Sequence, residues 1–402
     1  MNGPLDRRGL AVLAAGHAAA DLCQGAIPAL IPFLIAQRHY SYAAAGALLL
    51  AVTLGSSIIQ PAFGAVSDRL SLPWLMPLGV ALSAVGIAGC ALAPSFGLTA
   101  VAAGVGGLGV AAWHPEGARY ANYASVGRRG TGMAIFSVGG NTGFALGPVL
   151  VTPAVLALGL SGAAIVAVLP AIVAVVVARE LPRLHEHRTA GGHADAAAAA
   201  GVPDRWGPFS RLGGAVALRS GVYFGLQSFV PVWFVQRFGA SEAAGNAALT
   251  VMLASGAIGT LVGGRMVDRI GPRVVLIGSI AVQIPLLAAF VVSRGAVATA
   301  LLAAIGFVTI MSFSVTVVLG QEYLPHRLGI ASGVMLGTAI GVGGVAAVLL
   351  GVLADAAGLT AVMWTIAALP IPALALALTL PRGERPSRAG AVAGAGVASA
   401  PR

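Results

Sequence analysis

Two stretches that repeat each other decide how this chain is organised: Gly64-Ala-Val-Ser-Asp68-Arg69 and Gly264-Arg-Met-Val-Asp268-Arg269. The second copy begins at position 264 and the first at 64, so they lie 200 positions apart in a chain of 402 residues. Each copy follows one long apolar run and precedes another. This arrangement predicts two halves of the same construction, with a short polar turn at the same place in each half.

The composition around these copies fits lipid better than water. Hydrophobic residues make up 58% of the chain and charged residues 9%, with a mean hydropathy of +0.92. Soluble domains carry about 25% charged residues, so this chain cannot cover a water-facing surface of ordinary size. The net charge of +10 comes from arginines in short segments between apolar runs, which argues against nucleic-acid binding.

The apolar runs predict an all-α membrane protein with twelve transmembrane helices, because about 20 apolar residues span a bilayer as a helix. We expect the helices at 10–35, 44–66, 74–93, 98–118, 131–158, 160–178, 213–236, 244–267, 274–292, 296–320, 329–354 and 359–380. The predicted domains are an N-terminal six-helix bundle (1–180), a cytoplasmic linker (181–210), a C-terminal six-helix bundle (211–380) and a disordered cytoplasmic tail (381–402).

The arginines also predict the orientation, since cytoplasmic loops are enriched in Lys and Arg. With the N-terminus inside, the outer loops hold only Arg38, Arg237 and Arg294, and every other loop arginine faces the cytoplasm. Both termini are therefore expected in the cytoplasm. Parallel six-helix repeats with a solute site between the halves are a recognised transporter plan.

The repeated Gly-x-x-x-Asp-Arg turn resembles the loop signature of the major facilitator superfamily. The copy ending Asp268-Arg269-Ile-Gly-Pro-Arg273 is close to it, whereas the first copy lacks the trailing basic residues. Within that superfamily the chain resembles the fosmidomycin-resistance group of efflux proteins. The matching pieces are His17-Ala-Ala-Ala-Asp21 with Gln24, Ser56-Ser-Ile-Ile-Gln60-Pro61, His114-Pro115-Glu116 with Arg119, Ser137-Val-Gly-Gly-Asn141, and Gln321-Glu322-Tyr-Leu-Pro325.

The resemblance implies a proton-coupled exporter of a small drug-like or metabolite solute in a bacterial inner membrane. It also implies alternating access between two bundles, no cofactor and a monomer. The antiporter signature in the fifth helix is incomplete, because Gly143-Phe-Ala-Leu-Gly147-Pro148 is not followed by a glycine pair. A proton symporter or facilitator for uptake therefore stays open. A membrane sensor is a weaker alternative, because no soluble output domain is visible in the sequence.

The first helix carries the strongest candidates for proton coupling. His17, Asp21 and Gln24 fall at i, i+4 and i+7 and so share one helix face. Asp21 lies about 16 Å along the helix from Leu10, near the middle of the membrane. Desolvation there disfavours the charged carboxylate, so Asp21 is expected to bind and release the coupling proton, with His17 sharing it. Glu116 is a third candidate; a structural pairing of these groups is the alternative.

Candidate solute ligands lie on the first helix and on three others. Arg219 is a lone cation in the seventh helix and needs Asp21 or an anionic solute as its partner, unless it reaches the interface. The planar guanidinium suits phosphate or phosphonate. The remaining polar candidates for the cavity are Gln24, His114, Ser137, Asn141, Tyr223 and Gln227.

Charged residues at the cytoplasmic helix ends are expected to act as gates. Glu116 and Arg119 are spaced i, i+3 and can pair on one helix face. The other gating candidates are Asp68, Arg69, Asp268, Arg269 and Glu322. His114 and Glu116 lack the His-Glu-x-x-His spacing of a metal site. Because no nucleophile or metal constellation is visible, we expect neither a metal nor an enzyme.

Small residues predict two close helix contacts. Gly139, Gly143 and Gly147 recur every four residues in the fifth helix, and Gly333, Gly337 and Gly341 do the same in the eleventh. This period lets backbones approach closely.

Overall fold

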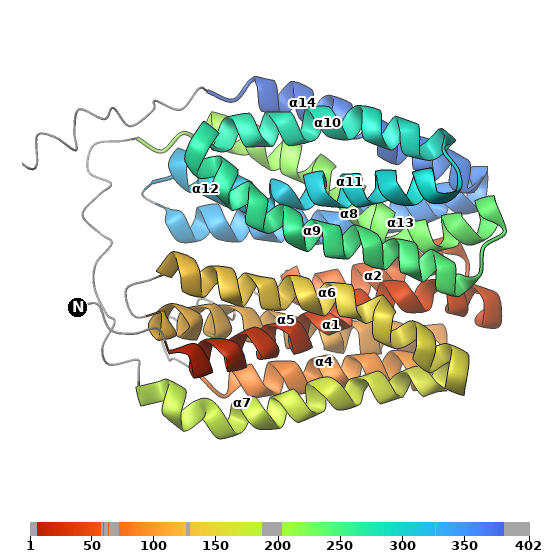
Figure 1. Cartoon of the computed structure of the whole chain (residues 1–402), viewed down its shortest axis with the longest axis horizontal. Coiled ribbons are helices and arrows are strands. Elements are labelled where there is room, and N and C mark those ends of the chain that lie inside the picture. Colours follow the sequence, from red (N-terminus) through yellow and green to blue (C-terminus); the bar gives the residue numbers. More distant parts are fainter. Residues whose placement is uncertain are drawn as a thin grey trace, which may run out of the picture.

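The computed structural model describes residues 6–57, 59, 63, 72–125, 129–186, 203–325 and 327–381. The first copy of the repeated turn, most of the predicted linker and almost all of the predicted tail lie outside these ranges. The described residues form helices and no strand, which suits lipid because a helix satisfies its own backbone hydrogen bonds. The helices lie in two layers, with the N-terminal half below the C-terminal half in Figure 1.

The N-terminal half contains the first six crossings. Its helices are α1 (Arg7–Arg38), α2 (Tyr42–Ser57), α4 (Leu75–Leu92), α5 (Phe96–Ala124), α6 (Arg129–Leu158), the 3-10 helix η1 (Leu160–Ala167) and α7 (Val168–Glu186).

The C-terminal half repeats this plan. Its helices are α8 (Trp206–Phe238), α9 (Glu242–Ile270), α10 (Pro272–Val292), α11 (Gly295–Met311), α12 (Phe313–Tyr323), α13 (Leu328–Ala368) and α14 (Pro370–Leu378).

The described helices account for the predicted twelve crossings. Nine are long and apolar enough to span a membrane, and α2 is a shorter apolar helix. The last of the nine breaks at Gly358, whose φ of 81° is a left-handed value that favours glycine. The chain reverses there, and α8 supplies the remaining crossing. The all-helical membrane fold in two bundles is therefore confirmed.

The two ends of the bundle differ. We call the end of the bundle at which α1 and α8 begin the near end, and the end at which they finish, at His39 and Gly239, the far end. The near end is on the left in Figure 1. At the near end, Arg183 pairs with Asp6 at 2.6 Å and Arg327 with Asp204 at 3.1 Å.

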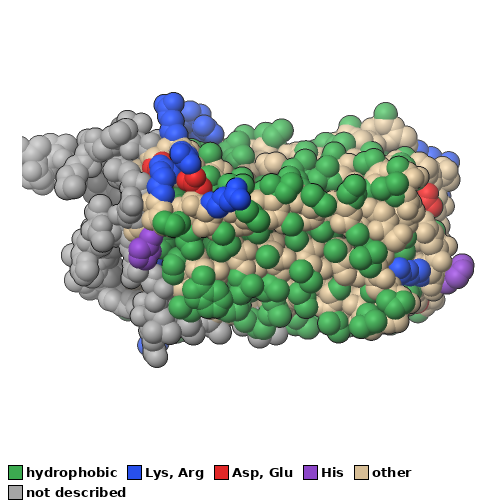
Figure 2. Space-filling model, turned by 90° about the horizontal axis from the view of Figure 1, so that it is seen from below, with side chains coloured by type: hydrophobic (Ala, Val, Ile, Leu, Met, Phe, Trp, Pro, Cys, Tyr) green, Lys and Arg blue, Asp and Glu red, His purple; other side chains and the backbone are tan. Residues whose placement is uncertain are grey.

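Between the two ends the surface is apolar. Figure 2 shows hydrophobic side chains over the long side of the molecule, with arginines gathered toward its ends. Val101, Val292 and Leu349 are all more than 60% exposed, which a soluble monomer could not sustain along a whole face. The protein is therefore a multi-pass membrane protein.

Glycines set the packing of α6 against α1, as the four-residue spacing predicts. A Cβ added to Gly139 would collide with the Ala14 carbonyl, and one added to Gly143 with the Ala18 carbonyl. The matching prediction for the eleventh helix is wrong at Gly337, which has open space around it. There the close contacts lie farther along α13, where Gly344 and Gly351 press against α2.

The described polar contacts between the halves lie midway between the two ends and toward the far end. Asp355 of α13 accepts hydrogen bonds from the backbone N–H groups of Tyr42 and Ala43, each at 2.9 Å. Its carboxylate thus caps the first turn of α2 in the other half, where backbone N–H groups have no partner within the helix. A Cβ on Gly46 would meet the Ala347 carbonyl, so the backbones of α2 and α13 touch there. These contacts hold α2 and α13 together at the far end.

Candidate functional site

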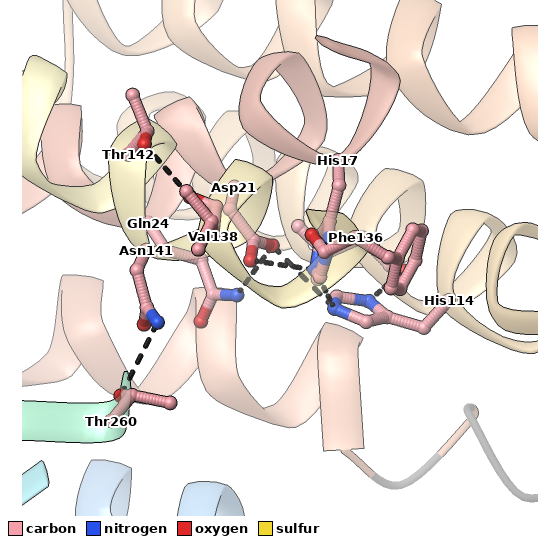
Figure 3. Close-up of polar contacts among 10 residues, drawn as sticks. His17, Asp21, Gln24, His114, Phe136, Val138, Asn141, Thr142 and Thr260 are labelled. Atoms are coloured by element: carbon pink, nitrogen blue, oxygen red, sulfur yellow. Dashed lines mark hydrogen bonds and ion pairs between the residues drawn. The ribbon is translucent and has the colours of Figure 1, made fainter. Parts of the chain in front are cut away.

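A cluster of ionisable side chains lies inside the N-terminal half. His17 and Asp21 come from α1 and His114 from α5, and Figure 3 shows the three side chains converging. Asp21 is 4% and His17 7% exposed, so both are buried at membrane depth. Burying ionisable groups in a membrane costs about 2.5–3.5 kcal/mol each, so they persist there when they serve a function or pair with one another.

The cluster is compact. His17 Nε2 lies 3.2 Å from Asp21 Oδ2, and His114 Nε2 lies 3.7 Å from Asp21 Oδ1. The two Nε2 atoms are 3.1 Å apart. A Cβ on Gly140 of α6 would lie 2.5 Å from His17 Nε2 and 2.8 Å from Asp21 Oδ2, so this glycine leaves room for the cluster.

Backbone carbonyls fix the orientation of both imidazoles. His17 Nδ1 is 2.7 Å from the Phe136 carbonyl, and His114 Nδ1 is 2.8 Å from the Val110 carbonyl. A carbonyl only accepts hydrogen bonds, so both Nδ1 atoms carry a hydrogen and donate it. In the neutral rings the two Nε2 lone pairs then face each other and Asp21. Such an arrangement is repulsive unless a cation, a proton included, sits among the three groups.

Gln24 connects this cluster to the other half of the protein. Its Nε2 donates to Asp21 Oδ1 at 3.3 Å, and its backbone carbonyl accepts from Gln227 Nε2 of α8 at 3.2 Å. Gln227 is 1% exposed, and its Oε1 has no hydrogen-bond partner within the described chain. The predicted residues His17, Asp21, Gln24, His114 and Gln227 therefore meet at one place.

A second contact between the halves lies near this cluster. Asn141 of α6 donates to Thr260 of α9 at 3.3 Å (Figure 3). Ser137 lies one turn before Asn141 and is half-buried. The spacing placed Ser137 and Asn141 on one side of the helix, and the structure adds Thr260, which the sequence analysis missed.

Arg219 lies elsewhere, inside the C-terminal half. Its Nη1 donates to the Thr309 carbonyl at 2.9 Å, and its guanidinium carbon lies 5.5 Å from the centre of the Phe313 ring. The residue is 4% exposed, so it does not reach the interface. No carboxylate of the described residues lies within salt-bridge distance of Arg219, and Asp21 faces the two histidines instead. Tyr223, one turn along α8, is half-buried.

Comparison with known proteins now places this geometry in a family. The family model described as "Major Facilitator Superfamily" matches residues 13–348. The chain belongs to the major facilitator superfamily. Members of this superfamily are membrane transporters, so the buried cluster lies in a transporter fold.

Two bacterial relatives match almost the whole chain. The chain is 33% identical to the fosmidomycin resistance protein of Escherichia coli, over 90% of each chain. It is 32% identical to the uncharacterised transporter YfnC of Bacillus subtilis, over 94% of this chain and 93% of the relative.

Solved structures support the fold. The nucleoside transporter NupG matches with a TM-score of 0.72 at 15% identity, covering 92% of this chain and 98% of that one. A bacterial homologue of the lysosomal transporter Spinster, in an inward-facing conformation, matches with a TM-score of 0.69 at 17% identity, covering 94% and 95%.

The structure does not bring Glu116 of this transporter into the His–Asp cluster. Glu116 is fully buried, and its Oε1 accepts from the Leu72 N–H at 2.9 Å and from Arg119 Nη1 at 3.4 Å. These contacts tie the near end of α5 to the segment that precedes α4. The proton-coupling role of Glu116 and the gating role of Arg119 stay predictions.

The other predicted gating residues are only partly described. Asp68 and Arg69 lie outside the described residues, as does the side chain of Asp268. Arg269 is exposed at the near end of α9, and Glu322 is exposed at the near end of α12. Their gating role stays a prediction.

A further contact between the halves was not predicted from the sequence. Asn246 of α9 is 1% exposed and donates to the Ala29 carbonyl at 3.0 Å and to Thr152 Oγ1 at 2.9 Å. An amide within an apolar run was a usable signal, because polar side chains in membrane helices hydrogen-bond neighbouring helices.

Proposed function

We propose that this protein exports a small solute from the cytoplasm in exchange for protons, by alternating access between its two halves. The His17–Asp21–His114 cluster carries this proposal, because it is a buried proton-binding group linked through Gln24 to the opposite half. The 33% identity to the fosmidomycin resistance protein supports export as the direction. The two bacterial relatives support placement in a bacterial inner membrane, and the arginine distribution supports both termini in the cytoplasm.

The cluster offers a route from proton binding to a change of conformation. Protonation removes the negative charge of Asp21, which accepts the hydrogen bond from the Gln24 side chain. The Gln24 carbonyl in turn accepts from Gln227 of the other half. A proton therefore alters one chain of hydrogen bonds that spans the two halves. Such differential contact is what lets a ligand shift a two-state equilibrium.

In the conformation described above, contacts hold the two halves together at the far end. Export then requires the contacts of Asp355, Asn246 and Gly46 to break while the near end closes. The candidate near-end gates are Asp68, Arg69, Arg119, Asp268, Arg269 and Glu322. Alternating access in this superfamily's plan is rocking of the two bundles about a fixed site at the membrane midplane.

We place the solute between the halves, against polar groups from both. From the N-terminal half these are His114, Ser137, Asn141 and Gln24; from the C-terminal half they are Gln227, Tyr223 and Arg219. Gln227 Oε1 is buried and free to accept a hydrogen bond from a solute. Arg219 would attract an anionic solute, because its charge has no carboxylate to pair with among the described residues.

Uptake into inside-out membrane vesicles tests this function, with fosmidomycin as the first probe. An acidic lumen should drive fosmidomycin into the vesicles above its external concentration, and collapse of the pH gradient with an ionophore should release it. Vesicles without the protein are the control. Accumulation only in right-side-out vesicles with an alkaline lumen would instead establish proton symport for uptake. Facilitated movement without any dependence on the gradient would contradict proton coupling.

Replacement of Arg219 by alanine tests the anion site. Arg219→Ala should raise the Km for fosmidomycin roughly 10–100-fold, since a hydrogen bond to a charged group contributes about 1.5–3 kcal/mol. The uncharged diester of the same phosphonate should change far less. Arg219→Lys keeps the charge, so its Km for fosmidomycin should lie between that of the unmodified protein and that of Arg219→Ala. Equal losses for the acid and the diester would show that Arg219 acts through folding rather than through the anion.

A further inference from the structure

The same cluster has the donor set of a metal site. Two imidazole nitrogens and a carboxylate converge from α1 and α5, and their ligand atoms all lie within 4.8 Å of one another. Imidazole and carboxylate groups are ligands of zinc, cobalt, nickel and other first-row transition metals. From the sequence, His114 with Glu116 was the metal site to consider, and no metal was expected.

The surroundings of the two histidines match those of metal ligands. A histidine that binds a metal through one ring nitrogen almost always donates its other N–H to a carbonyl or carboxylate, which fixes the ring. Here His17 and His114 each donate Nδ1–H to a backbone carbonyl, at 2.7 and 2.8 Å. The two Nε2 atoms, which then carry lone pairs in the neutral rings, lie 3.1 Å apart beside Asp21 (Figure 3).

The shortest separations between the ligand atoms are close to those around a tetrahedral ion. Zinc lies about 2.0–2.2 Å from imidazole nitrogen and carboxylate oxygen, so two ligand atoms of a tetrahedral site are roughly 3.3 Å apart. The two Nε2 atoms are 3.1 Å apart, and each lies against a different oxygen of Asp21: His17 Nε2 is 3.2 Å from Oδ2, and His114 Nε2 is 3.7 Å from Oδ1. With one ligand atom from each residue, the three atoms lie within 4.8 Å of one another, so the longest separation must shorten when an ion binds. A proton shared between the two imidazoles would need only two of these groups, whereas a metal ion uses all three. We infer that His17, Asp21 and His114 form a binding site for one divalent transition-metal ion, with zinc the best fit.

The site is complete within one half of the protein. All three ligands belong to the N-terminal bundle, so the ion binds without requiring the two halves to move together. The side chain of His114 is 22% exposed, which gives an ion a way in, while those of His17 and Asp21 are 9% and 6% exposed. Three protein ligands leave the fourth tetrahedral position to water or to an oxygen of a bound solute.

One consequence rests on the proposed function. If Asp21 and His17 carry the coupling proton, a bound metal ion occupies the same atoms and excludes it. Zinc should then inhibit proton-driven transport reversibly, with recovery on addition of a chelator. Metal binding itself requires neither a gradient nor a solute, so it is tested separately.

The test is zinc binding to the purified full-length protein in detergent, by isothermal titration calorimetry. We expect one Zn²⁺ per chain and a higher melting temperature with zinc, because a ligand that binds only the folded state stabilises it. His114→Ala and His17→Ala should each weaken binding by more than about tenfold, since loss of even an outer-shell partner costs about 10–100-fold. His39→Ala is the matched control, because His39 is exposed at the far end.

Zinc X-ray absorption on the unmodified protein supplies a measurement that needs no variant. It should show two imidazole ligands and oxygen ligands in a four-coordinate site. Absence of stoichiometric binding overturns the inference. So does binding that persists unchanged in both histidine variants, which would place the ion on other histidines such as His185 or His193. Neither result affects the vesicle experiment, and failure of transport does not affect the binding measurement.

Discussion

Asp21→Asn should abolish the accumulation of solute driven by a pH gradient, to the level of vesicles that lack the protein. Asparagine keeps the shape of the side chain and an oxygen that accepts the hydrogen bond from Gln24, but it cannot bind and release a proton in this pH range. Exchange of labelled for unlabelled solute across the membrane requires no net proton movement, so it should survive. The measurement is concentrative uptake and exchange in the same vesicle preparation, with fosmidomycin as the solute.

A carboxylate-to-amide change elsewhere is the control for this variant. Glu242→Gln makes the same chemical change at the far end of α9, in a residue that makes no contact with the cluster. It should retain gradient-driven accumulation. If Asp21→Asn concentrated solute as well as the unmodified protein, Asp21 would have no part in coupling. If Asp21→Asn lost both exchange and accumulation, the solute site would be damaged rather than uncoupled from the proton.

Gly143→Ala should destabilise the N-terminal half by about 1–3 kcal/mol, the usual cost of an extra methyl group in a tightly packed interior. Its Cβ would collide with the Ala18 carbonyl, which is backbone and cannot rotate away. The helices α1 and α6 would have to separate, and α1 carries Asp21 and His17. We expect a lower melting temperature in detergent and weaker transport.

A glycine with free space around it makes a matched comparison. Gly278 of α10 is exposed and has nothing within 4 Å of an added Cβ. Gly278→Ala should leave the melting temperature unchanged or raise it, since alanine is favoured over glycine in a helix by about 0.5–1 kcal/mol. Equal melting temperatures for the Gly143 and Gly278 variants would show that α1 and α6 are not in the close contact described here.

Much of the site could be predicted from α1 alone, because helical spacing is a local property. His17, Asp21 and Gln24 were placed on one face by the 3.6-residue period, and the structure puts them there. His114 was predicted as a solute ligand and weighed with Glu116 as a metal site, but it was not expected beside Asp21, because it lies 97 residues away from His17 in the chain. No periodicity relates two separate helices, so its place beside Asp21 could not be predicted. Glu116, two residues farther on, points to Leu72 and Arg119 instead.

Composition and local pattern were enough to establish the environment, the helices and the duplicated plan of the chain. A chain with 58% hydrophobic residues and 9% charged residues needs lipid, and lipid requires every backbone group to be satisfied within a helix. The repeated turn at Gly64 and Gly264 determined the division into two halves. The tertiary structure alone decided which polar groups meet: His114 with His17, Gln227 with Gln24, and Arg219 with Thr309 rather than with Asp21. The physical reason is that apolar composition and helical period are local, whereas the rotation and depth of one helix against another depend on packing between residues far apart in the chain.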